Sequence, residues 1–87
     1  MGGGGATLKK PQHERKGMEL RSPAVGKVLR VSISVGAHVE RGQELMVIES
    51  MKVEIPIKAN ATGHVKELHV KAGDHVQRNR ILVRIEA

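Results

Sequence analysis

From Met18 onward, short alternating runs of apolar residues are separated by turns that contain glycine, a pattern typical of strands. No stretch keeps a helical period over three turns, so the pattern predicts an all-β domain. The apolar positions of these runs are Val28, Val31, Ile33 and Val35; Leu45, Val47 and Ile48; Val65, Leu68 and Val70; Val76; and Ile81, Val83 and Ile85.

The second half of this pattern repeats the first half at an offset of 37 residues. With positions of similar character included, the copies span residues 18–49 and 55–86. Neither copy is large enough to close a core, so the two must pack together about an approximate two-fold axis as a flattened β-barrel or sandwich. Ten residues recur identically: Ala24, Gly26, Val28, Gly36, His38, Val39, Arg41, Leu45, Ile48 and Glu49 return as Ala61, Gly63, Val65, Gly73, His75, Val76, Arg78, Leu82, Ile85 and Glu86.

Only residues 50–54, Ser-Met-Lys-Val-Glu, lie between the two copies. The two-fold relation makes this connection the counterpart of the opening between the two ends of the domain. We therefore expect it to project at the end opposite the termini. Residues 1–17 contain one large apolar side chain, Leu8, which is too little to offset the entropy of ordering them. The predicted organisation is a disordered N-terminal tail or linker over 1–17 followed by one domain over 18–87.

The composition limits the chemistry of this domain. Its core must be aliphatic, because the 87 residues include no Phe, Trp or Tyr. The absence of cysteine excludes disulfides and thiolate sites. The net charge of +6 is spread along the chain, and without aromatic platforms for bases it does not indicate nucleic-acid binding. No apolar run reaches membrane-spanning length, so we expect no membrane partner.

Histidines offer little support for a metal site, and we expect none. His38 and His75 are repeat mates, and His64 and His69 are close in sequence, but neither pair has a third ligand at a suitable spacing. A phosphate-binding glycine loop is not expected either, because no helix follows the glycines. We expect turns at Gly26, Gly36, Gly63 and Gly73, and Gly42 and its mate Asn79 both tolerate a positive φ.

The connection and its flanks, Val47-Ile48-Glu49-Ser50-Met51-Lys52-Val53-Glu54-Ile55-Pro56, resemble the biotinyl and lipoyl attachment domains. The likeness covers residues 18–86 and includes the stretches Pro23-Ala24-Val25-Gly26, Gly42-Gln43-Glu44-Leu45, Gly63-His64-Val65 and Ala72-Gly73-Asp74. It implies that each half supplies four strands of a barrel-sandwich hybrid. It also implies that Lys52, on an exposed hairpin between the halves, is the attachment point of a covalent cofactor. Such a domain is a carrier and has no catalytic residues of its own.

The neighbours of Lys52 bear on the choice of cofactor. Biotin-accepting members typically have Met before the acceptor Lys and often Met after it, whereas lipoyl-accepting members have Asp before it and Ala or Val after it. Met51 therefore favours biotin, although it could instead fill the core. Val53 departs from the biotin pattern and leaves lipoate as the alternative. The resemblance also implies that a biotin protein ligase modifies Lys52. The residues that the ligase would recognise are Met51, Val53, Glu49 and Glu54.

The resemblance implies a monomeric carrier that moves a carboxyl group from a biotin carboxylase site to a carboxyltransferase site. We expect a cytoplasmic location, or the mitochondrial matrix in a eukaryote. Two alternatives stay open: a lipoyl carrier of a 2-oxoacid dehydrogenase complex, and a barrel of the same shape that carries no group, as in the structural adaptors of efflux assemblies. The two copies align without a gap, so the extra loop by which some biotin carriers contact the cofactor has no counterpart.

Overall fold

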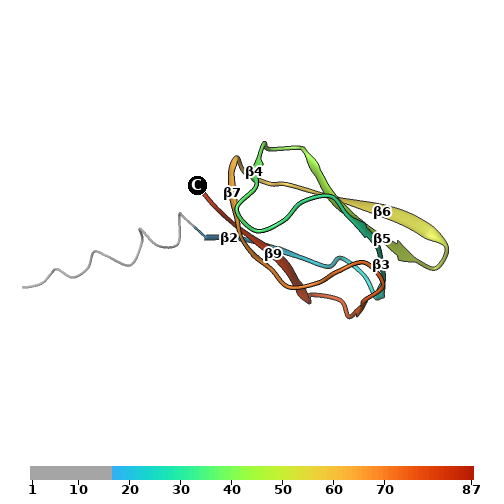
Figure 1. The fold of residues 1–87 in the computed structure, drawn as a ribbon. Helices are drawn as coiled ribbons and strands as arrows, with labels where there is room; N and C mark the ends of the chain where they lie inside the picture. Colours follow the sequence, from blue (N-terminus) through green and yellow to red (C-terminus); the bar gives the residue numbers. More distant parts are fainter. Residues whose placement is uncertain (1–16) are drawn as a thin grey trace, which may run out of the picture.

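The computed structural model describes residues 17–87, which form eight β-strands in two facing layers (Figure 1). This confirms the all-β prediction. Within this range no helix is long and apolar enough to cross a membrane. The predicted tail lies outside the described residues, except for Gly17, which opens the first strand. The strands are β2 (Gly17–Arg21), β3 (Gly26–Val31), β4 (His38–Val39), β5 (Glu44–Ser50), β6 (Val53–Lys58), β7 (Gly63–Leu68), β8 (His75–Val76) and β9 (Ile81–Glu86).

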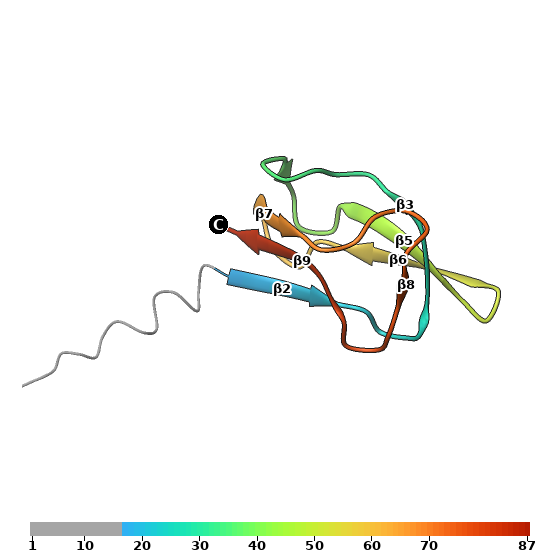
Figure 2. The ribbon, with the colours of Figure 1, turned by 60° about the horizontal axis from the view of Figure 1, so that its bottom comes forward.

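Each layer is a four-stranded antiparallel sheet that combines strands from both copies of the repeat (Figure 2). One sheet has the order β2-β9-β7-β4 and the other has the order β6-β5-β3-β8. Exchanging the copies converts one order into the other, because β2, β3, β4 and β5 correspond to β6, β7, β8 and β9. The predicted sandwich with four strands from each half is confirmed, and the two halves interlock.

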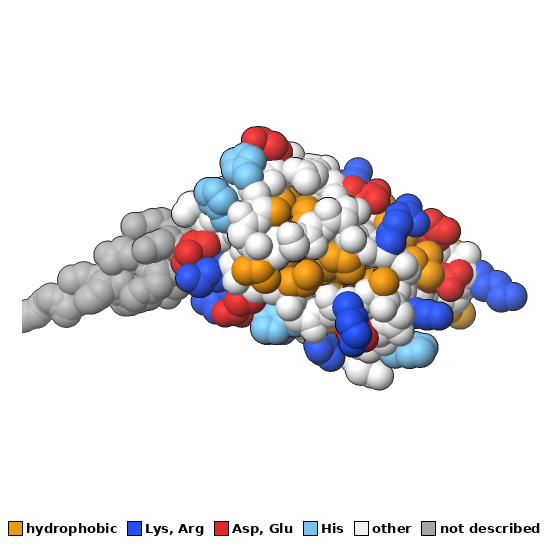
Figure 3. Space-filling view, viewed as in Figure 1, with side chains coloured by type: hydrophobic (Ala, Val, Ile, Leu, Met, Phe, Trp, Pro, Cys, Tyr) orange, Lys and Arg blue, Asp and Glu red, His pale blue; other side chains and the backbone are white. Residues whose placement is uncertain are grey.

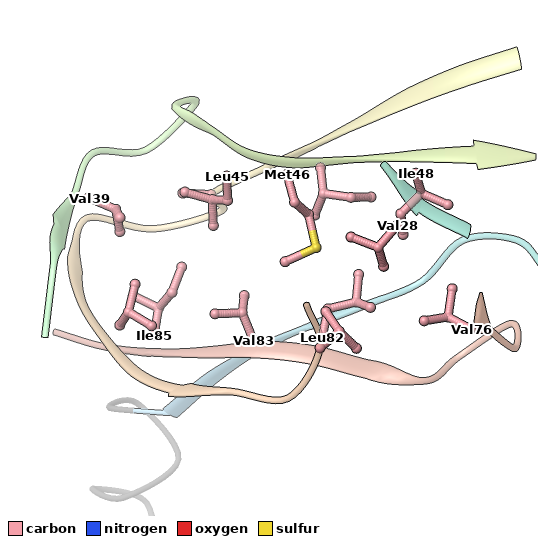
Figure 4. Packing of buried hydrophobic residues seen from close by; sticks show 13 residues of the cluster. Val28, Val39, Leu45, Met46, Ile48, Val76, Leu82, Val83 and Ile85 are labelled. Atoms are coloured by element: carbon pink, nitrogen blue, oxygen red, sulfur yellow. The ribbon is translucent and has the colours of Figure 1, made fainter. Parts of the chain in front are cut away.

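The core lies between the layers and is aliphatic. Figure 4 shows Leu45, Met46 and Ile48 of β5 pointing toward β9 of the other layer, with the Met46 sulfur between the two layers. Because every such residue faces its repeat mate's sheet, neither half buries its apolar surface alone. The buried set contains five pairs of mates, Val28 and Val65, Val39 and Val76, Leu45 and Leu82, Met46 and Val83, and Ile48 and Ile85, together with Ile57, Ala59 and Val70.

The apolar run that ends at Val35 is only partly a strand. β3 ends at Val31, Ile33 is partly buried and Val35 is 62% exposed. The chain then turns at Gly36, whose φ is 93° and whose N–H donates to the Val65 carbonyl oxygen at 2.8 Å. The alternation predicted too long a strand because these residues cross from one sheet to the other.

The predicted turns are present at Gly36 and Gly73, where φ is 93° and 97°. The prediction was wrong for Gly26 and Gly63, each of which begins a strand. A Cβ atom at Gly26 would collide with the carbonyl oxygen of Glu49 in the neighbouring strand, and one at Gly63 would collide with the corresponding oxygen of β9. Glycine is needed at these two positions because the strands approach closely there.

Candidate attachment site

The strands on either side of the connection between the copies, β5 and β6, form a hairpin with a two-residue turn. Ser50 pairs with Val53, which leaves Met51 and Lys52 as the turn. The connection is therefore shorter than the five residues expected, since Ser50, Val53 and Glu54 belong to the strands. The hairpin projects from the end of the sandwich opposite the start of β2 and the C-terminus (Figures 1 and 2).

Met51 and Lys52 both occupy the left-handed region of backbone conformation, with φ of 52° and 68°. Two consecutive positive φ values between paired antiparallel strands define a type I′ turn, whose twist matches that of the strands. Such turns prefer Asn and Gly, because a residue with a Cβ atom pays roughly 1–2 kcal/mol for this conformation. The pairing of β5 with β6 imposes this turn on two residues that disfavour a positive φ. Backbone strain is therefore concentrated at Met51 and Lys52, the tip of the hairpin.

The side chains at the tip of the hairpin extend into solvent. Met51 is 93% exposed, Val53 is 59% exposed, and Lys52 is also exposed. Met51 therefore lies in solvent and not in the core, while its role in ligase recognition stays a prediction. Among residues 17–87 the Lys52 ammonium has no ion-pair partner. A free primary amine at a protruding tip suits an amide-linked group, and acylation would remove its charge.

Two carboxylates lie behind the tip on adjacent strands. Glu49 and Glu54 are register partners, and Glu49 also faces Lys27 of β3 in the register of the other side. Like charges directly opposite one another weaken strand pairing slightly. Within the described part of the chain, neither carboxylate has a basic nitrogen within 4.0 Å, so neither forms an ion pair there. The surface of residues 17–87 contains no pocket in which these groups could act as an enclosed acid and base.

The histidines are grouped differently from the sequence pairs. His38 of β4 is the register partner of His64 of β7, and their ring centroids are 5.4 Å apart with the planes at 72°. His75 instead pairs with Lys27, and His69 contacts a neighbouring carboxylate at 2.9 Å. Among residues 17–87 no three histidine or acidic side chains are grouped to hold a metal ion. Acidic, basic and histidine side chains are interspersed over the face shown in Figure 3.

A small sandwich with an exposed lysine at the tip of a projecting hairpin has the architecture of a carrier domain for a covalently attached group. The family model described as "Biotin-requiring enzyme" matches residues 18–85, and the chain belongs to this family of biotinyl and lipoyl attachment domains. Membership implies a covalently attached biotin or lipoate, without deciding between them. It also means that the domain is not a catalyst by itself.

The chain is similar to one curated protein and to a part of a larger enzyme of known structure. The chain is 46% identical over 35 residues to the biotin/lipoyl attachment protein of Bacillus subtilis (strain 168), a match that covers 40% of this chain and about half, 48%, of that protein. The urea carboxylase of Kluyveromyces lactis superposes with a TM-score of 0.74 and 32% identity over 79% of this chain and 6% of the carboxylase.

Two further structures share the fold. The lipoyl domain of the 2-oxoglutarate dehydrogenase complex from Azotobacter vinelandii has a TM-score of 0.71 and 25% identity, over 80% of this chain and 96% of that domain. A single-chain, multi-domain long-chain acyl-CoA carboxylase has a TM-score of 0.76 over 95% of this chain and 8% of its own. Its 24% identity supports a common fold alone.

Proposed function

We propose that the chain is a biotin carboxyl carrier in which a biotin protein ligase modifies Lys52. The observation that carries this proposal is the placement of Lys52 at the tip of the β5–β6 hairpin, next to a Met51 side chain that is 93% exposed. Methionine before the acceptor lysine is typical of the biotin-accepting members of the family. The likeness to a urea carboxylase at 32% identity supports the same choice.

The residue that would hold the cofactor is Lys52, through an amide between Nζ and the carboxyl group of biotin. In ligation the Lys52 ammonium would first lose a proton, and its neutral Nζ would attack the acyl carbon of an acyl-adenylate. The adenylate would leave, the nitrogen would give up a second proton, and an uncharged amide would replace the positive charge. Once attached, biotin would supply the chemistry of carrying a carboxyl group between a biotin carboxylase site and a carboxyltransferase site. The contribution of this chain is to present the amide clear of the sandwich on two paired strands.

The position of the hairpin supports delivery between two sites. It lies at the end opposite the start of β2 and the C-terminus, so attachment of either end to a larger assembly leaves the tip free (Figure 1). Tethering of this kind raises the local concentration of the carried group at each site. The matched part of the urea carboxylase is 6% of its chain, so the catalytic sites would come from other domains or subunits.

A lipoyl carrier is the second candidate. It is favoured by Val53, since valine after the acceptor lysine is typical of lipoyl-accepting members, and by the likeness to a lipoyl domain over 96% of that domain. In that case Lys52 would hold lipoate through the same kind of amide.

Co-expression of the full chain with a biotin protein ligase, and separately with a lipoate ligase, tests both candidates by intact mass and avidin capture. We expect a biotin adduct on the wild type, its loss in Lys52→Arg, and its retention in Lys58→Arg, which changes an exposed lysine of β6 outside the turn. A biotin adduct that survives Lys52→Arg, or a lipoyl adduct alone, refutes the proposal. A wild type left unmodified by both ligases would favour a barrel that carries no group.

A further inference from the structure

Three of the four exposed large hydrophobic side chains among residues 17–87 belong to the hairpin end of the sandwich. They are Val25, Met51 and Val53, which are 58%, 93% and 59% exposed. The fourth, Val35, is 62% exposed and lies in the loop after β3. That loop begins at the other end of the sandwich, where the N–H after β3 donates to the carbonyl oxygen of Leu45 near the start of β5.

Val25 is distant from the hairpin in sequence but lies beside it in the fold. Lys27 pairs with Glu49, and a Cβ atom at Gly26 would collide with the Glu49 carbonyl oxygen, so the two backbones are in close contact at this level. Because β3 and β5 are antiparallel, each step back along β3 is a step forward along β5 toward the turn. Val25 precedes Gly26 and therefore lies near the base of the hairpin that presents Lys52.

The repeat supplies an internal reference for this position. The mate of Val25 is Thr62, in the turn between β6 and β7, next to a glycine whose closest contacts are the C-terminal residues. The Thr62 hydroxyl accepts a hydrogen bond from the Arg41 N–H at 3.1 Å. A polar side chain of the same shape therefore fits this turn at the end without the hairpin. The fold alone does not require the apolar valine at residue 25.

We infer that Val25 is a specificity-determining residue, which forms one apolar contact surface with Met51 and Val53 for the ligase that modifies Lys52. This inference rests on the proposed function. An active site that reaches Lys52 Nζ must enclose the tip, and a protein surface that does so also approaches the base of the hairpin. The occupant is a protein and not the cofactor itself, because residues 17–87 contain no pocket that could receive a small molecule. Val25 adds a contact from a separate segment, by which the ligase distinguishes a folded domain from a hairpin peptide.

The substitution Val25→Thr, which copies the repeat mate, tests this assignment in the full chain. Val35→Thr is the matched control, since it makes the same chemical change at a similarly exposed valine. Both variants should unfold at the wild-type temperature. In steady-state assays with a biotin protein ligase we expect KM for Val25→Thr to rise about tenfold with kcat unchanged, the scale for one lost apolar contact in a specific site. Val35→Thr should match the wild type.

The outcomes separate the inference from the function on which it rests. Equal KM values for Val25→Thr and the wild type overturn the inference and leave the proposed function intact, as does a fall in kcat at unchanged KM. Normal ligation of Val25→Thr with slower carboxyl transfer assigns the residue to a later partner and overturns the assignment to the ligase. A wild type that receives no biotin at Lys52 overturns the proposed function itself.

Discussion

Replacing the turn residues in the double variant Met51→Asn, Lys52→Gly should stabilise the unmodified domain. Asn and Gly are the residues that type I′ turns prefer, and the native pair adopts φ of 52° and 68° without being either. The change removes little packing, because Met51 is 93% exposed and Lys52 is exposed as well. The pairs Ser50 with Val53 and Glu49 with Glu54 stay as they are.

The expected gain follows from the two backbone conformations. A non-glycine residue in the left-handed region costs roughly 1–2 kcal/mol. Glycine gives back roughly 0.5–1 kcal/mol because its unfolded chain has more freedom to lose. A net stabilisation of about 1 kcal/mol should remain for the pair. In a domain of 60–100 residues this corresponds to a rise in Tm of roughly 4–8 °C.

Thermal unfolding followed by circular dichroism measures this shift. Asn79→Gly is the internal control, since Asn79 also has a positive φ, 72°, but asparagine tolerates it, so the gain there should be less than about 0.5 kcal/mol. A melting temperature of the double variant at or below that of the wild type would refute the reasoning from backbone strain. The same variant should also accept no cofactor from a ligase, because it lacks the amine that we propose as the attachment point.

Two further predictions concern close packing and acid stability. Gly26→Ala and Gly63→Ala should each lower the free energy of unfolding by about 2 kcal/mol, because the new Cβ atom would meet the carbonyl oxygen of Glu49 or of Glu86; denaturant titration measures both losses. The Lys71 N–H donates to the Asp74 carboxylate at 3.0 Å and, helped by the Lys71 ammonium, lowers the pKa of Asp74. A carboxylate whose pKa is lowered by folding stabilises the folded state at every pH above its pKa in the unfolded chain, which is about 4. This stabilisation is lost as the pH falls below that value and through the pKa of the folded state. Asp74→Asn should therefore be less stable than the wild type at pH 7 and converge with it in acid, while a constant difference down to pH 2 would contradict this account.

The architecture could be predicted from the sequence because most core positions occur twice. Pairs such as Leu45 and Leu82 place equivalent strands in equivalent environments, and the two-fold relation then locates the connection that carries Lys52. The spacing of glycines was less informative, since a close approach at Gly26 and a turn at Gly36 look alike in sequence. The two-residue turn could not be predicted, because Met-Lys has no preference for positive φ and the strand pairing imposes it.

Contacts between segments that are distant in sequence escaped prediction for a related reason. The pairing of His38 with His64 joins one copy to the other, so it depends on the order of strands in a sheet and not on spacing along the chain. The position of the exposed Val25 near the hairpin likewise follows from the register of β3 on β5. Neither feature has a local signal, whereas the exposed turn around Lys52 is marked by the break in the repeat.

Two departures from the two-fold relation lie at the hairpin end. Glu86 is bridged by Lys66 at 3.6 Å, but the mates of these residues are Glu49 and Leu29, so the glutamate below the turn has lost the corresponding cation. In the same way a valine at residue 25 replaces the hydrogen-bonded threonine of the other end. The core needs both copies alike, since each buries the other. Surface positions are under no such constraint, so they can differ between the two ends of the sandwich. The two differences described here, at Val25 and at Glu49, lie near Lys52, the single lysine between the copies.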